Sequence, residues 1–265
     1  MLFRRFGVIS TDAESAVAPG IPGGNARRSP CVVVDMSDVA SARVPEILVD
    51  VWFDVRCPWC FLGKRRLERA AQLFAQDHPD VPVTVSHHSF ELAPGIPDRF
   101  DGSEADYLQK YEGAPLEQSN RMIPELQKLA ASEGVQLKFE DLQLVNTRRA
   151  HRVFQMGEHR GVGEELLDRI FTAYFTECQD LADPEVLARL AAEVGLDHAE
   201  AYDAAENGFE SRWDDAVTAD HVRGQMLGAS GVPFSLINGK YRVPGAQSAE
   251  VFAEALREVM RREFS

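Results

Sequence analysis

The sequence predicts an α/β protein in which a helical block interrupts a β-sheet. Three observations indicate this class. An apolar run at residues 47–53 is typical of a buried strand. Apolar residues with helical spacing fill most of the region from about 94 to 227, and strand character returns at 232–237 before a last helix. This order of elements is typical of an α/β sheet that carries a helical insertion.

Length and composition support a globular protein and exclude two classes of partner. The chain has 265 residues, of which 45% are hydrophobic and 26% are charged, so it can bury a core without disulfide staples. Its net charge of −14 opposes general binding to nucleic-acid phosphates or to an anionic membrane. We therefore expect neither nucleic acid nor a membrane among its partners.

The first part of the sequence predicts a cytoplasmic protein with a loose extension. Asp12 and Glu14 interrupt the chain before a secretory signal could form, and no stretch approaches the roughly 18 apolar residues of a membrane span. Residues 19–25 are rich in Gly and Pro and are typical of turns. We expect residues 1–44 to form an extension that is disordered or loosely docked.

The first folded unit is predicted to be strand, helix, strand. The strand at 47–53 is broken only by Asp50. From Phe61 onward apolar residues recur at three- and four-residue intervals, with charged residues on the opposite face, which indicates an amphipathic helix. Residues 81–87 alternate around three valines and are typical of a second strand.

A helical region is predicted next, and a hairpin and a helix follow it. Asn238-Gly239 is a strong signal for a two-residue turn between strands at 232–237 and 241–243. The last helix is expected from 249 to about 262. The expected helices of the middle region cover 104–111, 116–132, 148–158, 164–176, 184–193, 198–207 and 211–226. The chain thus divides into the extension at 1–44, a sheet-containing domain at 45–93 and 228–265, and an inserted α-helical domain at 94–227.

A C-x-x-C motif carries the chemistry of this sequence. Cys57 and Cys60 form the motif, while Cys31 and Cys178 are isolated, and in a reducing compartment this pattern indicates a redox or metal site. Pro58 suits the first turn of a helix, so Cys57 is expected at a helix N-terminus. The aligned N–H groups there favour the thiolate that attacks a disulfide.

Two nearby cations are expected to assist this thiolate. Arg56 is adjacent to Cys57, and Lys64 lies within two helical turns. Cys60, one turn into the helix and more buried, is expected to resolve the mixed disulfide that Cys57 forms.

A structural zinc site is the alternative use of the motif. Zinc would require two further ligands, and His87-His88 is the only close pair of candidates. Adjacent residues of a strand point to opposite faces, so both are not expected to bind one metal ion. We therefore expect no metal.

Pro233 is the second unusual feature. It opens a predicted strand, where proline is uncommon away from an edge. It is either an edge-strand proline or a cis proline held beside the cysteine pair. Because cis bonds are a minority even before proline, the residues alone favour the first interpretation.

Several segments resemble one known family. Residues 52–63 (WFDVRCPWCFLG) and 231–234 (GVPF) resemble the DsbA family, specifically its cytoplasmic FrnE-like branch. Residues 146–152 (NTRRAHR), 174–177 (YFTE) and 239–247 (GKYRVPGAQ) resemble it too, and all lie in the same order. The resemblance runs from about residue 47 to the C-terminus.

This resemblance implies a fold, an activity and the roles of several residues. It implies a thioredoxin-like fold with a large α-helical insertion domain and a thiol–disulfide oxidoreductase. It also implies that Cys57 is the nucleophile, that Cys60 resolves, and that Pro233 is a cis proline packed against them. Val232 would then offer backbone groups to a bound substrate chain, which would add as a strand.

Further residues are expected around this pair. Trp59, Phe61 and Phe234 are expected to form an apolar rim for the substrate, to which Pro58 contributes. Asp54 could relay protons to Cys60 or cap a turn, and both roles stay open.

Two residues outside the motif also leave alternatives. His151 lies on a predicted helix. The favoured interpretation is a surface or core histidine whose hydrogen bonds are satisfied. The resemblance places its segment toward the active-site cleft, so a role in substrate binding stays open. Cys178 occupies a position where the family pattern has glycine, and we expect an inert buried thiol rather than an accessory redox thiol.

The expected partners follow from this chemistry. They are a protein or small-molecule thiol or disulfide and a cellular thiol reductant, and a homodimer stays open. No cofactor is expected beyond the redox-active disulfide, although glutathione is a candidate reductant or ligand.

Two other functions compete with this interpretation. Kappa-class glutathione transferases and hydroxychromene carboxylate isomerases resemble the same architecture but have a serine where Cys57 stands. A glutathione-dependent isomerase or transferase is therefore the alternative function. A non-catalytic interaction or metal-binding protein is the third.

Overall fold

The computed structural model describes residues 45–264, so the extension predicted at 1–44, Cys31 included, lies outside the described residues. The helices are α1 (Pro58–Asp77), α2 (Glu104–Glu112), α3 (Leu116–Ser132), α4 (Arg148–His159), α5 (Gly163–Phe175), α6 (Pro184–Glu193), α7 (His198–Glu206), α8 (Arg212–Met226) and α9 (Ala249–Phe264). The strands are β1 (Ile47–Phe53), β2 (Val83–Ser89), β3 (Arg99–Phe100), β4 (Leu144–Val145), β5 (Phe234–Ile237) and β6 (Tyr241–Pro244).

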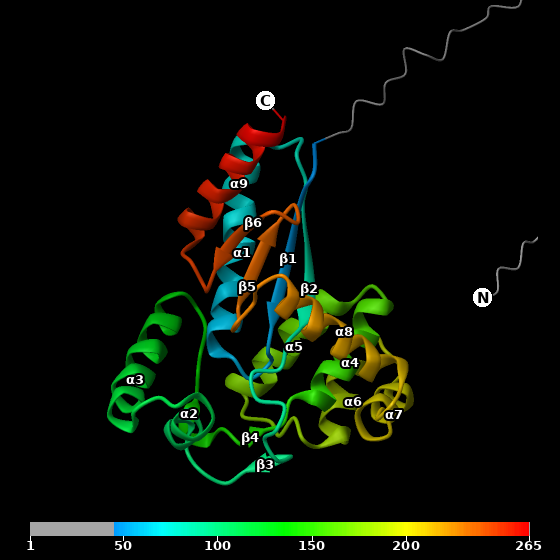
Figure 1. Cartoon of the computed structure of the whole chain (residues 1–265). Helices are drawn as coiled ribbons and strands as arrows, with labels where there is room; N and C mark the ends of the chain where they lie inside the picture. Colours follow the sequence, from blue (N-terminus) through cyan, green and yellow to red (C-terminus); the bar gives the residue numbers. More distant parts are fainter. Residues whose placement is uncertain (1–44, 265) are drawn as a thin grey trace, which may run out of the picture. The chain divides into compact units, whose positions relative to one another are not determined.

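Four strands form a mixed sheet in the order β2-β1-β5-β6 (Figure 1). Strand β1 runs parallel to β2 and antiparallel to β5, with Val49 opposite both Val85 and Ile237. Parallel neighbours require a crossover connection, which α1 provides here. Because β1 is an inner strand, the segment that follows Phe53 leaves from the middle of the sheet edge.

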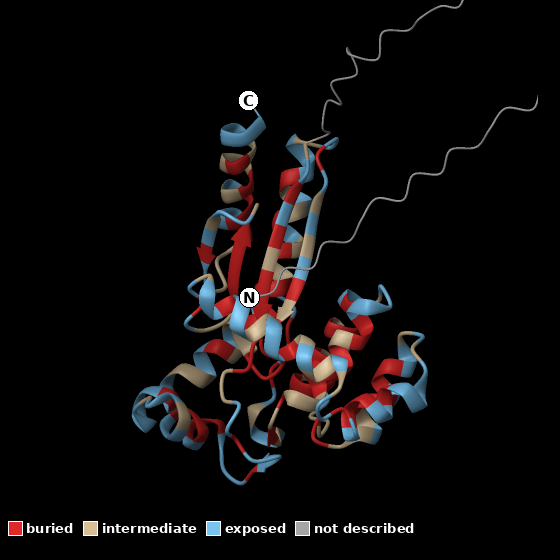
Figure 2. Ribbon diagram, turned by 45° about the vertical axis from the view of Figure 1, so that its right-hand side comes forward, coloured by how far each residue is buried: buried red, intermediate tan, exposed pale blue. Residues whose placement is uncertain are grey.

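Helices α1 and α9 cover one face of this sheet. Ile47, Val49 and Val51 alternate along β1 and point toward these helices, where Phe74 and Phe252 complete a buried cluster. Figure 2 shows the buried residues along the strands and the inner sides of these helices. The alternation predicted from the apolar run therefore has a clear packing partner.

Helix α8 lies against the opposite face, over Trp52. The indole of Trp52 is fully buried, and its Nε1 donates a hydrogen bond to the carbonyl of Asp220 at 2.9 Å. A Cβ atom placed on Gly224 would lie 2.7 Å from Cδ1 of Trp52. Glycine at this position therefore allows the close approach of α8 to the sheet.

Aromatic rings pack strand β1 and helix α1 against helices α4 and α5. Phe53, the last residue of β1, meets Phe154 of α4 and Phe171 of α5 with ring centroids 4.8 and 6.1 Å apart. Phe61 of α1 stacks on Phe171 at 5.1 Å. Both ends of the segment that carries Cys57 are thus held by the same aromatic cluster.

The thioredoxin-like α/β class predicted from the sequence is confirmed, and most element boundaries agree within two residues. The short pair β3–β4 and the 3-10 turn Phe139–Asp141 were not predicted. The hairpin loop is longer than predicted, since Ile237 pairs with Tyr241 and encloses three residues rather than two. Strand β5 begins at Phe234, so Pro233 precedes the strand instead of opening it.

No helix between residues 45 and 264 is both long and apolar enough to span a membrane. Within that part of the chain, no three His, Cys, Asp or Glu side chains are grouped as metal ligands would be. His87 and His88 point to opposite sides, His87 to Glu164 and His88 to Asp50 and Asp220.

His88 predicts a pH dependence of stability. Its Nε2 lies 2.7 Å from Oδ1 of Asp50, and its Nδ1 lies 3.2 Å from Oδ1 of Asp220. Burial by itself would lower the pKa of His88, but the two carboxylates outweigh it and raise the pKa to about 9. Since this folded-state pKa exceeds the unfolded value, the stabilisation is complete below about pH 6.5 and is lost as the pH rises through about 9.

The free energy of unfolding should therefore fall between pH 6.5 and 9.5 by on the order of 2 kcal/mol more in the wild type than in His88→Gln. Urea unfolding at both pH values measures this difference. The exposed His198, which pairs with Glu185, provides the matched control His198→Gln, which should keep the wild-type dependence. Equal pH dependences for the wild type and His88→Gln would contradict the assignment.

Candidate active site

Cys57 and Cys60 lie at the junction of β1 and α1. Cys57 is the N-cap residue of α1, Pro58 opens the helix, and Cys60 follows in the first turn. The backbone N–H of Cys57 donates to the carbonyl of Asp54 at 3.0 Å, which closes the turn between strand and helix. Both sulfurs are free thiols, and their residues are only 5% and 3% exposed. The positive end of the helix thus faces the sulfur of Cys57.

The loop before β5 lies directly against Cys57. The Val232–Pro233 peptide bond is cis, and the thiol of Cys57 donates to the carbonyl of Val232 at 3.5 Å. The carbonyl of Pro233 accepts from the N–H of Gly245 at 3.1 Å. A Cβ atom on Gly63 would come within 3.4 Å of the Pro233 ring, so helix and loop pack closely. The structure therefore brings together Cys57, Cys60, Val232 and Pro233, as predicted.

The two thiols have different environments. Burial raises the pKa of Cys60 well above its usual range, and the neighbouring Cys57 raises it further. Cys57 instead lines an open cavity. A cysteine in a cavity wall beside one that does not line the cavity is the arrangement expected for an attacking and a resolving cysteine.

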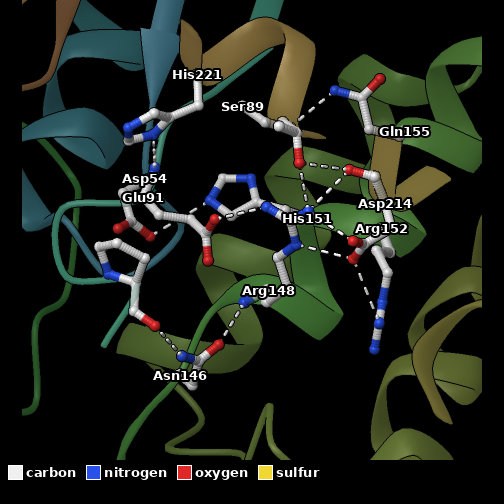
Figure 3. A network of polar contacts seen from close by, with 12 residues as sticks. Asp54, Ser89, Glu91, Asn146, Arg148, His151, Arg152, Gln155, Asp214 and His221 are labelled. Carbon is white, nitrogen blue, oxygen red and sulfur yellow. Dashed lines mark hydrogen bonds and ion pairs between the residues drawn. The ribbon is translucent and has the colours of Figure 1, made fainter. Parts of the chain in front are cut away.

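Asp54 is fully buried and close enough to Cys60 to raise the pKa of that thiol; Figure 3 shows it beside His151. It accepts hydrogen bonds from the N–H groups of Leu92, at 2.8 Å, and Arg56, at 3.3 Å, and it lies 3.5 Å from Nε2 of His151. Burial would raise the pKa of Asp54, but His151 and these hydrogen bonds outweigh it and leave the pKa below its usual value. Asp54 is therefore ionised at neutral pH, and it both caps backbone groups and lies beside the thiols.

His151 is fully buried on α4, between Asp54 and the ring of Phe53, whose centroid is 5.3 Å away. It does not line the cavity at Cys57, so the contact with substrate considered for it is not available in this structure. The alternative of a core histidine agrees with its burial. Its pairing with Asp54 across 97 positions of sequence was not predicted.

A second polar network anchors the helices below this pair (Figure 3). Arg148 donates to both carboxylate oxygens of Asp214, at 2.8 and 2.7 Å, and to Glu91 at 2.8 Å. The N–H of Glu91 in turn donates to Nδ1 of His221 at 3.2 Å. These charge-assisted bonds connect α4, α8 and the segment after β2. They therefore fix the helix that carries His151 and the segment whose Leu92 N–H binds Asp54.

A cavity of about 480 Å³ opens beside Cys57. Its apolar lining includes Pro58, Trp59 and Val232, which were predicted to meet substrate, and it extends between the redox turn and helices α2 and α3. Phe234 lies outside it and lines a neighbouring surface groove with Val232 and Pro233. The remaining apolar residues of the cavity are Leu92, Leu108, Met122, Ile123, Leu126 and Phe139.

The cations near the motif do not act as predicted. The buried ammonium group of Lys64 is paired with Glu68, Glu164 and Asp168 instead of reaching Cys57. Arg56 turns toward α2, where its guanidinium lies 3.2 Å above the ring centroid of Tyr107. The helix N-terminus is therefore the clearer source of positive potential at Cys57.

Cys178 follows α5 in a left-handed conformation, with φ of 55°. This conformation explains why glycine suits the position. The thiol is half-buried, donates to the carbonyl of Lys138 at 3.6 Å, and has a raised pKa, mainly because of burial. A raised pKa lowers the thiolate fraction and agrees with an inert role.

The fold and the cysteine pair define a thioredoxin-like protein with a dithiol site. Residues 48–257 match the family model of the DSBA-like thioredoxin domain, and the chain belongs to this family. The family predicted from the sequence is thereby confirmed.

Known relatives agree with this assignment. The chain is 28% identical over 217 residues to the uncharacterised protein YwbO of Bacillus subtilis, and the match covers 81% of this chain and 98% of that protein. The crystal structure of a probable DsbA oxidoreductase from Streptomyces coelicolor shares 33% identity with a TM-score of 0.74, and covers 83% of this chain and 92% of its own.

Two more distant structures share the fold. They are a 2-hydroxychromene-2-carboxylate isomerase and the cytosolic disulfide reductase DsbM of Pseudomonas aeruginosa with GSH. Their identities to this chain are 18% and 19%, and their TM-scores are 0.59 and 0.54. Both matches cover 81% of this chain, with 97% of the isomerase and 99% of DsbM.

Proposed function

We propose that this protein catalyses thiol–disulfide exchange, with Cys57 as the nucleophile and Cys60 as the resolving cysteine. The observation that carries the proposal is the position of Cys57. Its sulfur lies at the N-terminus of α1, 3.5 Å from the carbonyl of Val232, and lines a cavity, while Cys60 lies buried one turn into the helix. This places the sulfur of Cys57 at a helix N-terminus in the cavity wall, and Cys60 outside the lining of that cavity.

The reduced protein transfers two electrons to a disulfide in two exchanges. The Cys57 thiolate attacks one sulfur of the substrate, forms a mixed disulfide and releases the other half as a thiolate, which takes up a proton. Cys60 then loses its proton and attacks the sulfur of Cys57. The Cys57–Cys60 bond forms, and the second half of the substrate leaves as a thiol. The same steps in reverse oxidise a dithiol.

Asp54 is the proton acceptor in the second exchange. The pKa of Cys60 is raised by burial, so this thiol needs a base before it can attack. Asp54 is ionised and fully buried, and it is close enough to Cys60 for its charge to raise the pKa of that thiol. The hydrogen bonds from Leu92 and Arg56 hold the carboxylate in place.

Two surfaces are available for substrates. Within residues 45–264 the backbone N–H of Val232 has no hydrogen-bond partner, so an extended peptide can pair with it as an added strand. The cavity beside Cys57 suits a small thiol compound. We expect a cellular thiol to return the protein to its dithiol form, in the cytoplasm, with no resident cofactor.

The test is reduction of insulin disulfides by the purified protein, together with its reduction potential against glutathione. Multiple turnovers are expected, and the potential gives the direction of electron flow in a reducing compartment. In parallel, conjugation of glutathione to 1-chloro-2,4-dinitrobenzene tests the alternative glutathione-dependent function. Conjugation without insulin reduction would replace the proposal by an isomerase or transferase.

A further inference from the structure

The guanidinium of Arg56 is buried without a hydrogen bond. Arg56 is 4% exposed, and its contacts are an ion pair with Glu104 at 3.5 Å and the ring of Tyr107. Among residues 45–264 no acceptor lies within hydrogen-bonding geometry of its side chain, and Nη1 is fully enclosed. A guanidinium has five N–H donors, and leaving them unsatisfied in the interior is costly. Arg148, by contrast, donates to Asp214, Glu91 and Thr218.

Arg56 lines the same cavity as Cys57. Tyr107 also lines the cavity and is 1% exposed, and its hydroxyl likewise lacks a partner among the described residues. The rest of the lining is mostly apolar, and α2 and α3 close the far side. Unsatisfied donors in a mostly apolar pocket of this volume are typical of a small-molecule site that recognises a polar group.

Two acidic side chains in the cavity do not cancel this charge. Burial raises the pKa of Glu104 to about 7, although Arg56 opposes the rise. Burial also raises the pKa of Glu112. Glu104 is thus partly protonated near neutral pH, so it pairs only in part with Arg56, whose positive charge stays available to an anion.

We propose that the cavity binds low-molecular-weight thiols or disulfides that carry a carboxylate, and that the guanidinium of Arg56 binds this carboxylate. A carboxylate matches the fork of N–H donors, and the Tyr107 hydroxyl can donate to the same group. Because Arg56 precedes Cys57, a substrate whose carboxylate lies a few bonds from its sulfur places that sulfur at the nucleophile. This inference rests on the proposed disulfide exchange and names its small-molecule substrates.

The experiment compares two disulfides of similar size. Reduced protein is mixed with 3,3′-dithiodipropionate, a dianion, or with bis(2-hydroxyethyl) disulfide, which is neutral. Oxidation of the Cys57–Cys60 pair is followed by the fluorescence of Trp59, which lies between them. The ratio of the two second-order rate constants reports carboxylate recognition, because a change in the reactivity of the thiol affects both substrates alike.

Three variants separate contact from general charge. Arg56→Gln removes fork and charge and should lower the ratio by at least about tenfold, the value of one charge-assisted hydrogen bond. Arg56→Lys keeps the charge but loses the fork, and should still lower the ratio severalfold. Glu104→Gln removes a competing negative charge and should raise it. Arg99→Gln, at an exposed arginine that does not line the cavity, should match the wild type.

The outcomes distinguish this inference from the function on which it rests. A ratio that is equal in the wild type, Arg56→Gln and Glu104→Gln would overturn carboxylate binding while leaving disulfide exchange intact. If Arg56→Lys keeps the wild-type ratio of rate constants, charge attraction alone explains the effect, and the proposed contact with the guanidinium is overturned. If neither disulfide oxidises the wild type, disulfide exchange fails and the inference fails with it. Urea unfolding of each variant shows that the comparison is made on folded protein.

Discussion

Replacing Cys57 by Ser should lower the rate of insulin reduction by at least about 10³-fold. The attacking species is a thiolate, and a serine hydroxyl is not ionised near neutral pH, so the first exchange cannot begin. The side chain is small and lies at the rim of a cavity, so the free energy of unfolding should change by no more than about 1 kcal/mol. The measurement is insulin turnover alongside urea unfolding of the same preparation.

Cys178→Ser provides the matched control for this prediction. This substitution also replaces one thiol by a hydroxyl, at a half-buried position away from the cavity. Burial raises the pKa of the Cys178 thiol that is removed. We expect its rate to stay within about twofold of the wild type. A Cys57→Ser protein that keeps a tenth of the activity, or a Cys178→Ser protein that loses most of it, would place the chemistry elsewhere.

Asp54→Asn should slow the second exchange by about 10- to 100-fold at neutral pH. General bases contribute about 10²- to 10⁴-fold, and part of the loss is offset because removing the negative charge of Asp54 makes the Cys60 thiol easier to ionise. The defect should shrink as the pH rises, since Cys60 then loses its proton without help. Single-turnover reduction of a disulfide across the pH range measures both effects.

The same substitution also disturbs backbone hydrogen bonds, and a matched control isolates that contribution. The half-buried carboxylate of Asp220 accepts from the N–H of Ser89 at 3.0 Å, much as Asp54 accepts from that of Leu92. Asp220→Asn should lower stability without changing the exchange rate or its pH dependence. If Asp54→Asn slows exchange equally at every pH, Asp54 supports the structure instead of accepting the proton.

Local signals in the sequence predicted most of the fold. The apolar run at β1 and the helical spacing of α3 and α6 predicted the first and last residues of these elements correctly. Each of them buries apolar residues at regular intervals. The strands β3 and β4 have two residues each, too few for any periodicity to be visible. The hairpin loop at Asn238 differs by one residue, since turn length depends on the register of the strands as well as on the turn residues.

Residue patterns alone predicted the site only where its residues are close in sequence, whereas the position of Val232 and Pro233 beside Cys57 was expected from the family resemblance. Cys57, Cys60 and Pro58 share one turn of helix, and their arrangement follows from spacing. The pair of Asp54 with His151 and the pair of Arg56 with Glu104 join residues that only the tertiary structure brings together. The expectation that Lys64 assists Cys57 was wrong because three carboxylates, two of them on α5, neutralise it.

Trapping the mixed disulfide tests the central claim most directly. In Cys60→Ser the first exchange remains possible, but no second thiol can release the substrate. Incubation with bis(2-hydroxyethyl) disulfide should yield a protein in which Cys57 carries one half of the substrate as a mixed disulfide. Mass spectrometry should detect this adduct and map it to Cys57, and dithiothreitol should remove it. An adduct at Cys178 with none at Cys57, or no adduct in folded Cys60→Ser protein, would contradict the assignment of Cys57 as the nucleophile.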